Sequence, residues 1–561
     1  MSRLIALVLS LVPVPALAQD TLRTVAERTD YLETSRHADV TQFCEALAKQ
    51  SQFVRLTEFG TSTEGRKLHL LTLSDPPVST PKEAADTKKP MVLAFANIHA
   101  GEVDGKEAVL ALARDLAAEK SLLKKLVVLI VPNLNPDGNE KIDPKNRMSQ
   151  NGPPSVGVRA NAQGLDLNRD FVKLESPEIR GLVRVFTEWN PLVVVDCHTT
   201  NGSYHRYTLT YDGPRYPAAD PRLVEAGQGR VLPDLAARVK KATGFDSFPY
   251  GNFSRDKTLW ETYPSSPRFG LQYLALRGRV GLLSESYTYA PFADRVKVSY
   301  AFVRAAFEYA ADHADELKKL TTDAEKPRTR VALRTRTVEE GKGATVHGYE
   351  ESMRDGRRVR TDTPRDYPVK LVTKCEPTLE ADVPAAYLIP PGFPAAVETL
   401  RRHGIKLEEL TGDVRAEAQS YRVTEIKKAA REFQKHAIVT LEVKPDKASH
   451  LLPAGSMLIP TAQPLGQLAA YLLEPQAEDG LAAWNLFDKS LEVGEWFPVV
   501  RLSEIPAALR QEKKEKEAPR RYTLDSLLVE PKGGGRPPGG GGGRGGFGGS
   551  VEWLPDGEHF L

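Results

Sequence analysis

The run Met91-Val-Leu-Ala-Phe-Ala-Asn-Ile-His-Ala-Gly-Glu102 decides the fold. Its apolar first half predicts a buried strand, and the amphipathic stretch from Ala108 to Glu119 predicts a helix shortly after it. His99 and Glu102 therefore lie where a strand ends and before a helix begins. Open α/β sheets bind their ligands at that end of the strands. Because an imidazole and a carboxylate there can face one cation, we interpret them as metal ligands.

A second apolar run, Leu192-Val-Val-Val-Asp-Cys-His198, predicts another buried strand with His198 at its tip. Two histidines and one glutamate form the ligand set of a catalytic zinc site that keeps an open position. The chain contains the same spacing a second time, in His313-Ala-Asp-Glu316. No strand precedes that copy, which lies in a charged helical run, so we interpret it as a solvated helix face.

Three further motifs follow in order: Asn135-Pro-Asp-Gly138, Asp166-Leu-Asn-Arg169 and Leu282-Leu-Ser-Glu285. Together with the His-x-x-Glu pair and the strand-end histidine, they resemble the zinc carboxypeptidase family (the carboxypeptidase A-like metallopeptidases) over roughly residues 20 to 315. The segment beyond resembles the C-terminal region of large secreted bacterial members. The resemblance implies an α/β fold, an α/β/α sandwich with a central mixed, mostly parallel sheet, and hydrolysis of C-terminal peptide bonds.

The resemblance also implies roles for the strand-end residues. His99, Glu102 and His198 would hold one Zn²⁺ in the catalytic domain. Zinc in such a site lowers the pKa of water to about 7 and polarises the scissile carbonyl. Glu285 matches the catalytic glutamate, which acts first as general base and then as general acid.

Substrate-binding roles follow in the same way. Asn168 and Arg169 match the residues that hold the terminal carboxylate of a peptide, and a guanidinium suits this task because it forms two parallel hydrogen bonds. Asp166 resembles the carboxylate that orients a ligand imidazole. For the cation that stabilises the oxyanion, Arg159 is preferred over Arg147 because it lies closer to the Asp-x-Asn-Arg motif.

Two alternatives remain open at this stage. The same metal site would serve an amidase or deacylase acting on murein peptides, and a non-catalytic binding protein could retain the fold. The family has a mobile tyrosine, and the sequence does not distinguish among Tyr263, Tyr273 and Tyr287. The side-chain preference of the enzyme and its oligomeric state are not determined by these patterns.

The first residues resemble a targeting segment. Arg3 precedes an apolar run from Leu4 to Val14, and Ala16-Leu-Ala18 is typical of a cleavage site. We therefore predict a signal peptide over residues 1–18 and an exported protein, either periplasmic or extracellular. No other apolar run has the length of a membrane span.

Composition agrees with a soluble globular chain. Among 561 residues, 41% are hydrophobic and the net charge is +2, so no charge bias indicates a nucleic-acid partner. Three cysteines provide no disulfide framework.

The chain divides by pattern into several segments. We predict a catalytic domain over 19–320, a polar linker over 321–328, a smaller α+β accessory domain over 328–512 and a charged and Gly-rich linker over 513–550. The Gly-rich part should be disordered because it cannot bury a core. Residues 551–561 resemble the start of a truncated further domain. In the catalytic domain we predict strands at 68–73, 92–96, 127–131, 193–196 and 280–284, and helices at 40–49, 106–119, 177–189 and 230–242.

Overall fold

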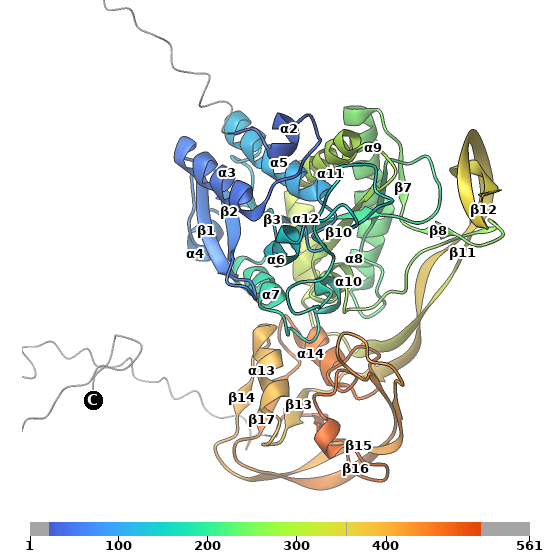
Figure 1. The fold of residues 1–561 in the computed structure, drawn as a ribbon. Helices are drawn as coiled ribbons and strands as arrows, with labels where there is room; N and C mark the ends of the chain where they lie inside the picture. Colours follow the sequence, from blue (N-terminus) through green and yellow to red (C-terminus); the bar gives the residue numbers. More distant parts are fainter. Residues whose placement is uncertain (1–21, 355, 507–561) are drawn as a thin grey trace, which may run out of the picture. The chain divides into compact units, whose positions relative to one another are not determined.

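The computed structural model describes residues 22–354 and 356–506 (Figure 1). The predicted signal peptide, the charged and Gly-rich linker and segment 551–561 lie outside these residues. None of the helices in the described part is both long and apolar enough to cross a membrane.

A sheet of eight strands carries the candidate site. Its four central strands are parallel to their neighbours within that group, and the flanking pairs are mostly antiparallel. The prediction of a mixed sheet is therefore confirmed. In spatial order the strands are β1 (Val54–Thr61), β2 (Lys67–Leu73), β4 (Val127–Val131), β3 (Met91–Ala96), β5 (Val193–Thr200), β10 (Val280–Tyr287), β6 (Leu209–Asp212) and β7 (Ser247–Pro249).

Helices cover both faces of this sheet, so its central strands are buried on both sides (Figure 1). On β3, Leu93 and Phe95 belong to a core that includes α7 (Pro177–Trp189). The alternate residues of β3 pack in a second core with α5 (Asp104–Glu119) and α11 (Phe292–Asp312). The remaining helices of this region are α2 (Val25–Arg28), α3 (His37–Gln50), α4 (Pro81–Asp86), α6 (Pro136–Glu140), η1 (Leu167–Arg169), α8 (Pro221–Ala226), η2 (Gly227–Val231), α9 (Leu232–Thr243), α10 (Gly270–Leu276) and α12 (Ala314–Ala324).

A glycine sets how closely α5 approaches the sheet. A Cβ atom on Gly105 would lie 2.4 Å from the Cβ of Cys197 on β5, closer than two carbon atoms can approach. Only glycine fits at this contact. The close approach fixes the beginning of α5, and with it the loop from β3 that carries His99 and Glu102. Cys197 itself faces α5, whereas the next residue, His198, faces the candidate site.

The prediction of a polar linker over 321–328 is wrong for its first four residues, because α12 continues to Ala324. Leu317, Thr321 and Ala324 are buried and lie on one face of α12. This spacing by four and then three residues is that of an amphipathic helix, and the many charges between the three residues concealed it. The charged helical run around His313 is also not one helix. It consists of α11, which ends at Asp312, and α12, which begins at Ala314.

The C-terminal region forms two more sheets. One joins the long hairpin β11 (Arg330–Arg354) and β12 (Arg357–Asp382) to β9 (Leu259–Glu261) and β8 (Asn252–Phe253). The other has six strands, in the order β14 (Glu408–Glu409), β17 (Met457–Pro460), β13 (Ala386–Ile389), β18 (Val500–Leu502), β15 (Val414–Lys428) and β16 (Val439–Leu452). The helices of this region are α13 (Pro394–Arg402), α14 (Gly466–Leu473) and η3 (Asp488–Ser490).

This region and the large sheet share one apolar core. Phe186 of α7 belongs to the same buried cluster as Leu400 of α13 and Trp484. Polar contacts join the two parts as well, since the Tyr273 hydroxyl lies 2.8 Å from Nδ1 of His403. The C-terminal region is therefore packed against the catalytic segment rather than tethered to it.

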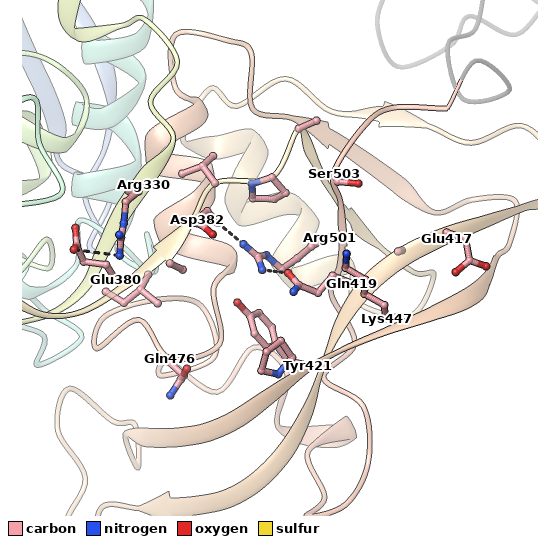
Figure 2. Close-up of a pocket in the computed structure, with 17 residues that line it drawn as sticks. Arg330, Glu380, Asp382, Glu417, Gln419, Tyr421, Lys447, Gln476, Arg501 and Ser503 are labelled. Atoms are coloured by element: carbon pink, nitrogen blue, oxygen red, sulfur yellow. Dashed lines mark hydrogen bonds and ion pairs between the residues drawn. The ribbon is translucent and has the colours of Figure 1, made fainter.

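The C-terminal region also contains a cavity of about 740 Å³ beside β15 and β18 (Figure 2). Arg501 lies on its wall and donates hydrogen bonds to the Gln419 side chain and the Asp382 carbonyl. The same guanidinium pairs with buried Glu474 at 3.0 Å. Its charge is thus already compensated within the protein, and no predicted catalytic residue lines this cavity.

The ion pair between His436 and Glu175 joins the two regions and should make stability depend on pH. Nε2 of His436 lies 2.8 Å from Oε1 of Glu175. The hydrogen bond to Glu175 raises the pKa of His436 despite partial burial. Burial opposes ionisation of Glu175, but hydrogen bonds from His436 and Lys173 outweigh it and lower the pKa of Glu175 to about 2.

The histidine contribution is complete below its unfolded pKa and is lost as pH rises through the raised pKa of the folded state. The carboxylate contribution is present above the unfolded pKa and is lost as pH falls through about 2. We therefore expect His436→Gln to lower stability by about 1 kcal/mol near pH 5.5, because Glu175 is partly exposed to screening water, and by less near pH 8.5. Thermal unfolding at the two pH values measures this, with Glu175→Gln as the partner variant. An equal loss at both pH values would contradict the expectation.

Candidate metal centre and substrate cleft

Three adjacent parallel strands, β3, β5 and β10, bring the predicted residues together. His198 on β5 is in register with Glu285 on β10, so their side chains emerge on the same face of the sheet. His99 lies three residues beyond the end of β3. Asn97 in between has φ 62°, a left-handed conformation that asparagine tolerates.

The three predicted metal ligands converge. Nδ1 of His99 lies 3.1 Å from Oε1 of Glu102, and Nδ1 of His198 lies 2.8 Å from Oε2 of the same carboxylate. The two Nδ1 atoms are 3.1 Å apart. All three side chains are buried, and their ligand atoms lie within 4.8 Å of one another. In the described part of the chain, this is the one group of His, Cys, Asp and Glu side chains with such a geometry.

The outer nitrogens of both rings face carboxylates. Nε2 of His99 lies 2.9 Å from Oδ1 of Asp166, and Nε2 of His198 lies 3.0 Å from Oδ1 of Asp196. Nε2 of His99 and Oδ1 of Asp166 share a hydrogen bond, so Nδ1 of His99 presents its lone pair toward Glu102. Neither carboxylate oxygen of Asp196 has a hydrogen-bond partner, so Asp196 acts on the His198 ring through its charge. Two imidazole nitrogens and a carboxylate that face one point fit a divalent cation such as zinc.

Sequence reasoning missed Asp196, although the signal was present. Residues two apart on a strand point to the same face, so Asp196 must accompany His198. Asp104 was also missed. Its Oδ2 accepts hydrogen bonds from the hydroxyls of Thr199 and Ser286, at 2.5 and 2.7 Å, and from Nε of Arg295 at 3.0 Å. This buried network joins β5 and β10 next to His198.

The site has strong internal electrostatics. Burial disfavours the Glu102 carboxylate, but His99 and Arg147 outweigh burial and hold the pKa of Glu102 well below its usual value. Burial likewise opposes a charge on His198, yet Asp196 and Glu102 raise the pKa of His198 well above its usual range. Both shifts arise because the group that gains or loses a proton faces opposite charges in a poorly hydrated site.

The pKa of Glu285 is shifted in the opposite direction to that of Glu102. Burial, together with the nearby carboxylates of Glu102 and Asp196, raises the pKa of Glu285 to about 8, although His198 and Arg159 oppose the rise. A carboxyl group whose pKa lies near neutrality can both accept and return a proton.

Both candidate arginines reach Glu102. Arg147 donates to Oε1 of Glu102, and Nη1 of Arg159 lies 3.4 Å from the same atom. Arg159 also donates from Nε to Oδ2 of Asp166, at 2.8 Å. The fold therefore brings both arginines to the site, and the geometry does not decide between them.

A cleft of about 290 Å³ opens over the three converging ligands. Asn168 and Arg169 line it, and the Arg169 guanidinium stacks on the ring of Phe269 with a separation of 4.3 Å. The cleft is also lined by the other predicted site residues, namely His99, Glu102, Arg159, His198 and Glu285. Asp166 acts from behind the cleft through its contact with His99.

The structure separates the tyrosines that the sequence could not distinguish. Tyr263 lines the cleft, whereas Tyr273 is fully buried and Tyr287 stacks on His205 with ring centroids 3.9 Å apart. A further tyrosine, Tyr250, also lines the cleft. Burial and the nearby Glu285 raise the pKa of Tyr250 to about 12. No sequence motif surrounds Tyr250, so only the fold reveals it.

Comparison with known proteins agrees with this geometry. Residues 40–217 match the family model of zinc carboxypeptidases. Carboxypeptidase 2 of Trichophyton rubrum is 26% identical over 498 residues, which cover 82% of this chain and 85% of that protein. Human carboxypeptidase D is 33% identical over 157 residues, 26% of this chain and 10% of that protein. The fungal alignment is longer than the predicted catalytic domain, so it includes much of the C-terminal region.

Solved structures give partial matches. A metallo-carboxypeptidase from Burkholderia cenocepacia aligns with 49% of this chain and 69% of its own, at 20% identity and a TM-score of 0.36. Carboxypeptidase A from Helicoverpa armigera aligns with 51% and 75%, at 16% identity and a TM-score of 0.40.

The motifs, the converging ligands and the family match define a metallopeptidase. Residues 40–217 match the zinc carboxypeptidase family, and the cofactor is zinc. The protein is a metallocarboxypeptidase, a hydrolase of peptide bonds.

Loss of one converging ligand should abolish stable zinc binding. We expect His99→Ala to retain far less than one zinc ion per chain after dialysis, because two ligands alone leave the site open to solvent. Plasma mass spectrometry of the purified protein measures the content. His313→Ala is the matched control, since His313 has the same spacing to a glutamate but lies on an exposed helix end. Equal zinc in both variants would contradict the assignment.

Proposed function

We propose that this protein is an exported exopeptidase that removes C-terminal residues from peptides, with Glu285 as general base and then general acid. The supporting observation is the register of β5 and β10, which sets Glu285 beside His198 in the cleft that Arg169 also lines. Export rests on the N-terminal sequence pattern.

The donor set suits the metal that the family uses. His99, Glu102 and His198 would hold zinc, which when bound polarises the scissile carbonyl and lowers the pKa of the attacking water. Asp166 keeps the His99 imidazole oriented through its outer nitrogen, and Asp196 places a negative charge 3.0 Å from the outer nitrogen of His198.

The chain's own residues carry the proton and bind the charges. Glu285 accepts a proton from water as the water oxygen attacks the carbonyl carbon, and it then donates that proton to the leaving nitrogen as the C–N bond breaks. Arg159 faces the developing oxyanion. Arg169 and Asn168 hold the terminal carboxylate, so that internal peptide bonds are not accepted.

Removal of the proton carrier should separate zinc binding from turnover. We expect Glu285→Gln to keep its zinc and to lose about 10²- to 10⁴-fold in kcat, because the amide is close in size but cannot accept the proton. Zinc content and hydrolysis of a dipeptide-like reporter measure the two effects. Glu316→Gln, on an exposed helix, serves as control. Wild-type turnover by the Glu285 variant would refute the mechanism and favour a different base.

The terminal carboxylate should govern which substrates are cleaved. We expect Arg169→Met to lower kcat/KM for a peptide with a free C-terminus by about 10- to 100-fold, since a charged hydrogen bond contributes about 1.5–3 kcal/mol. The same peptide with an amidated C-terminus should be a poor substrate for both proteins. If the wild-type enzyme cleaves the amidated peptide as well as the free acid, an amidase or deacylase function replaces the carboxypeptidase. The same comparison of cleavage rates can be made with isolated murein peptides whose C-termini are free or blocked.

A further inference from the structure

A residue of the C-terminal region contacts the candidate site directly. The backbone N–H of Asp166 donates to Oε1 of Gln434 at 2.8 Å, across 268 residues of sequence. We propose that Gln434, in the turn Phe433–His436, is a positioning residue that holds Asp166 from behind the cleft in the orientation that His99 and Arg159 require. The proposal rests on the function proposed above and extends it to the C-terminal region.

Asp166 is the junction of the site, so its position matters more than that of most residues behind the cleft. Its Oδ1 faces Nε2 of His99 at 2.9 Å and accepts the backbone N–H of Asn168 at 3.0 Å. Its Oδ2 accepts from Nε of Arg159 at 2.8 Å and lies 3.8 Å from Arg169. A small rotation of this one carboxylate would therefore move a metal ligand, the oxyanion cation and the carboxylate-binding arginine together.

The turn that presents Gln434 is conformationally costly. Phe433 and His436 exchange two backbone hydrogen bonds, at 2.8 and 3.0 Å, which close a two-residue hairpin turn. Gln434 and Lys435 have φ of 52° and 66°. Hairpin turns with two left-handed residues favour asparagine and glycine, and other residues there cost about 1 kcal/mol or more each. Such strain persists only where surrounding contacts impose it.

Those contacts are present on both sides of the turn. His436 lies 2.8 Å from Glu175 through Nε2 and 3.0 Å from the Asn485 side chain through Nδ1. On the other side, the Arg268 guanidinium lies 5.2 Å from the ring of Phe433. Arg268 adjoins Phe269, the residue on which Arg169 stacks. The strained turn is thus held by Glu175 and Asn485 through His436 and by Arg268 through Phe433.

The geometry assigns a specific effect to the Gln434 oxygen. Without this acceptor, the backbone N–H of Asp166 loses its side-chain partner and the peptide group is less restrained. The carboxylate then keeps its charge and its contacts but is held less firmly in its orientation. Groups that hydrogen-bond directly to a metal ligand change metal affinity or activity by about 10- to 100-fold when they are removed. Gln434 acts one contact further back, through Asp166, so an effect at the lower end of this range is expected. Since Gln434 does not line the cleft, substrate affinity should change little.

The test compares Gln434→Met with Gln434→Glu in the full-length protein. Methionine preserves length but lacks a strong acceptor, whereas glutamate restores an oxygen at the same position. We expect Gln434→Met to lower kcat about 10-fold with KM near the wild-type value, and Gln434→Glu to recover most of that loss. In the metal-free protein, zinc affinity by chelator competition should fall about 10-fold for the methionine variant, and amide exchange around Asp166 should accelerate.

Lys435→Met is the matched control, because it lies in the same turn with the same handedness and its side chain is exposed. It should retain wild-type kcat, zinc affinity and exchange. If Gln434→Met does not fold, Gln434→Asn withdraws the oxygen by one carbon and tests the same point. Equal effects of the 434 and 435 variants, or no change in zinc affinity and kcat in Gln434→Met, overturn the proposal. Because Glu285→Gln tests the base independently, failure here is distinguishable from failure of the proposed function.

Discussion

The buried carboxylate of Glu102 is the constraint on which the site depends. It lies between the Nδ1 atoms of His99 and His198 and accepts from Arg147 in a place with little water. A charge removed from water is costly unless opposite charges or hydrogen bonds compensate it. The surrounding groups therefore hold Glu102 ionised, and the same groups are oriented to hold a cation. The same set of side chains thus compensates the charge of Glu102 and faces the point where a metal ion would bind.

The sheet brings a further carboxyl group to this cluster of charges. Parallel strands expose their carboxyl ends on one edge, and the register of β5 with β10 places Glu285 next to His198. Burial near other carboxylates then raises the pKa of Glu285 toward neutrality, while Glu102 stays ionised. Two glutamates of the same chemistry thus acquire opposite pKa shifts from their surroundings.

The C-terminal region takes part in this arrangement instead of standing apart. It shares an apolar core with α7, and the turn that carries Gln434 reaches the backbone of Asp166. The family relative from Trichophyton rubrum aligns over a length that includes much of this region. A structural contribution to the site gives a physical reason for the two parts to be packed together.

The sequence by itself determined the central strands, the main helices and the residues at the strand ends, because apolar runs and strand-end polar motifs are local patterns. It did not reveal the length of the β11–β12 hairpin, the helical nature of residues 321–324, or the partners Asp196, Tyr250 and Gln434. Strand alternation could have identified Asp196, and the spacing of Leu317, Thr321 and Ala324 could have extended the helix to Ala324. Tertiary structure alone decided the places of Tyr250 and Gln434, since a hydrogen bond across 268 residues leaves no trace in local periodicity. Such contacts depend on how distant surfaces pack, and packing is a property of the whole chain.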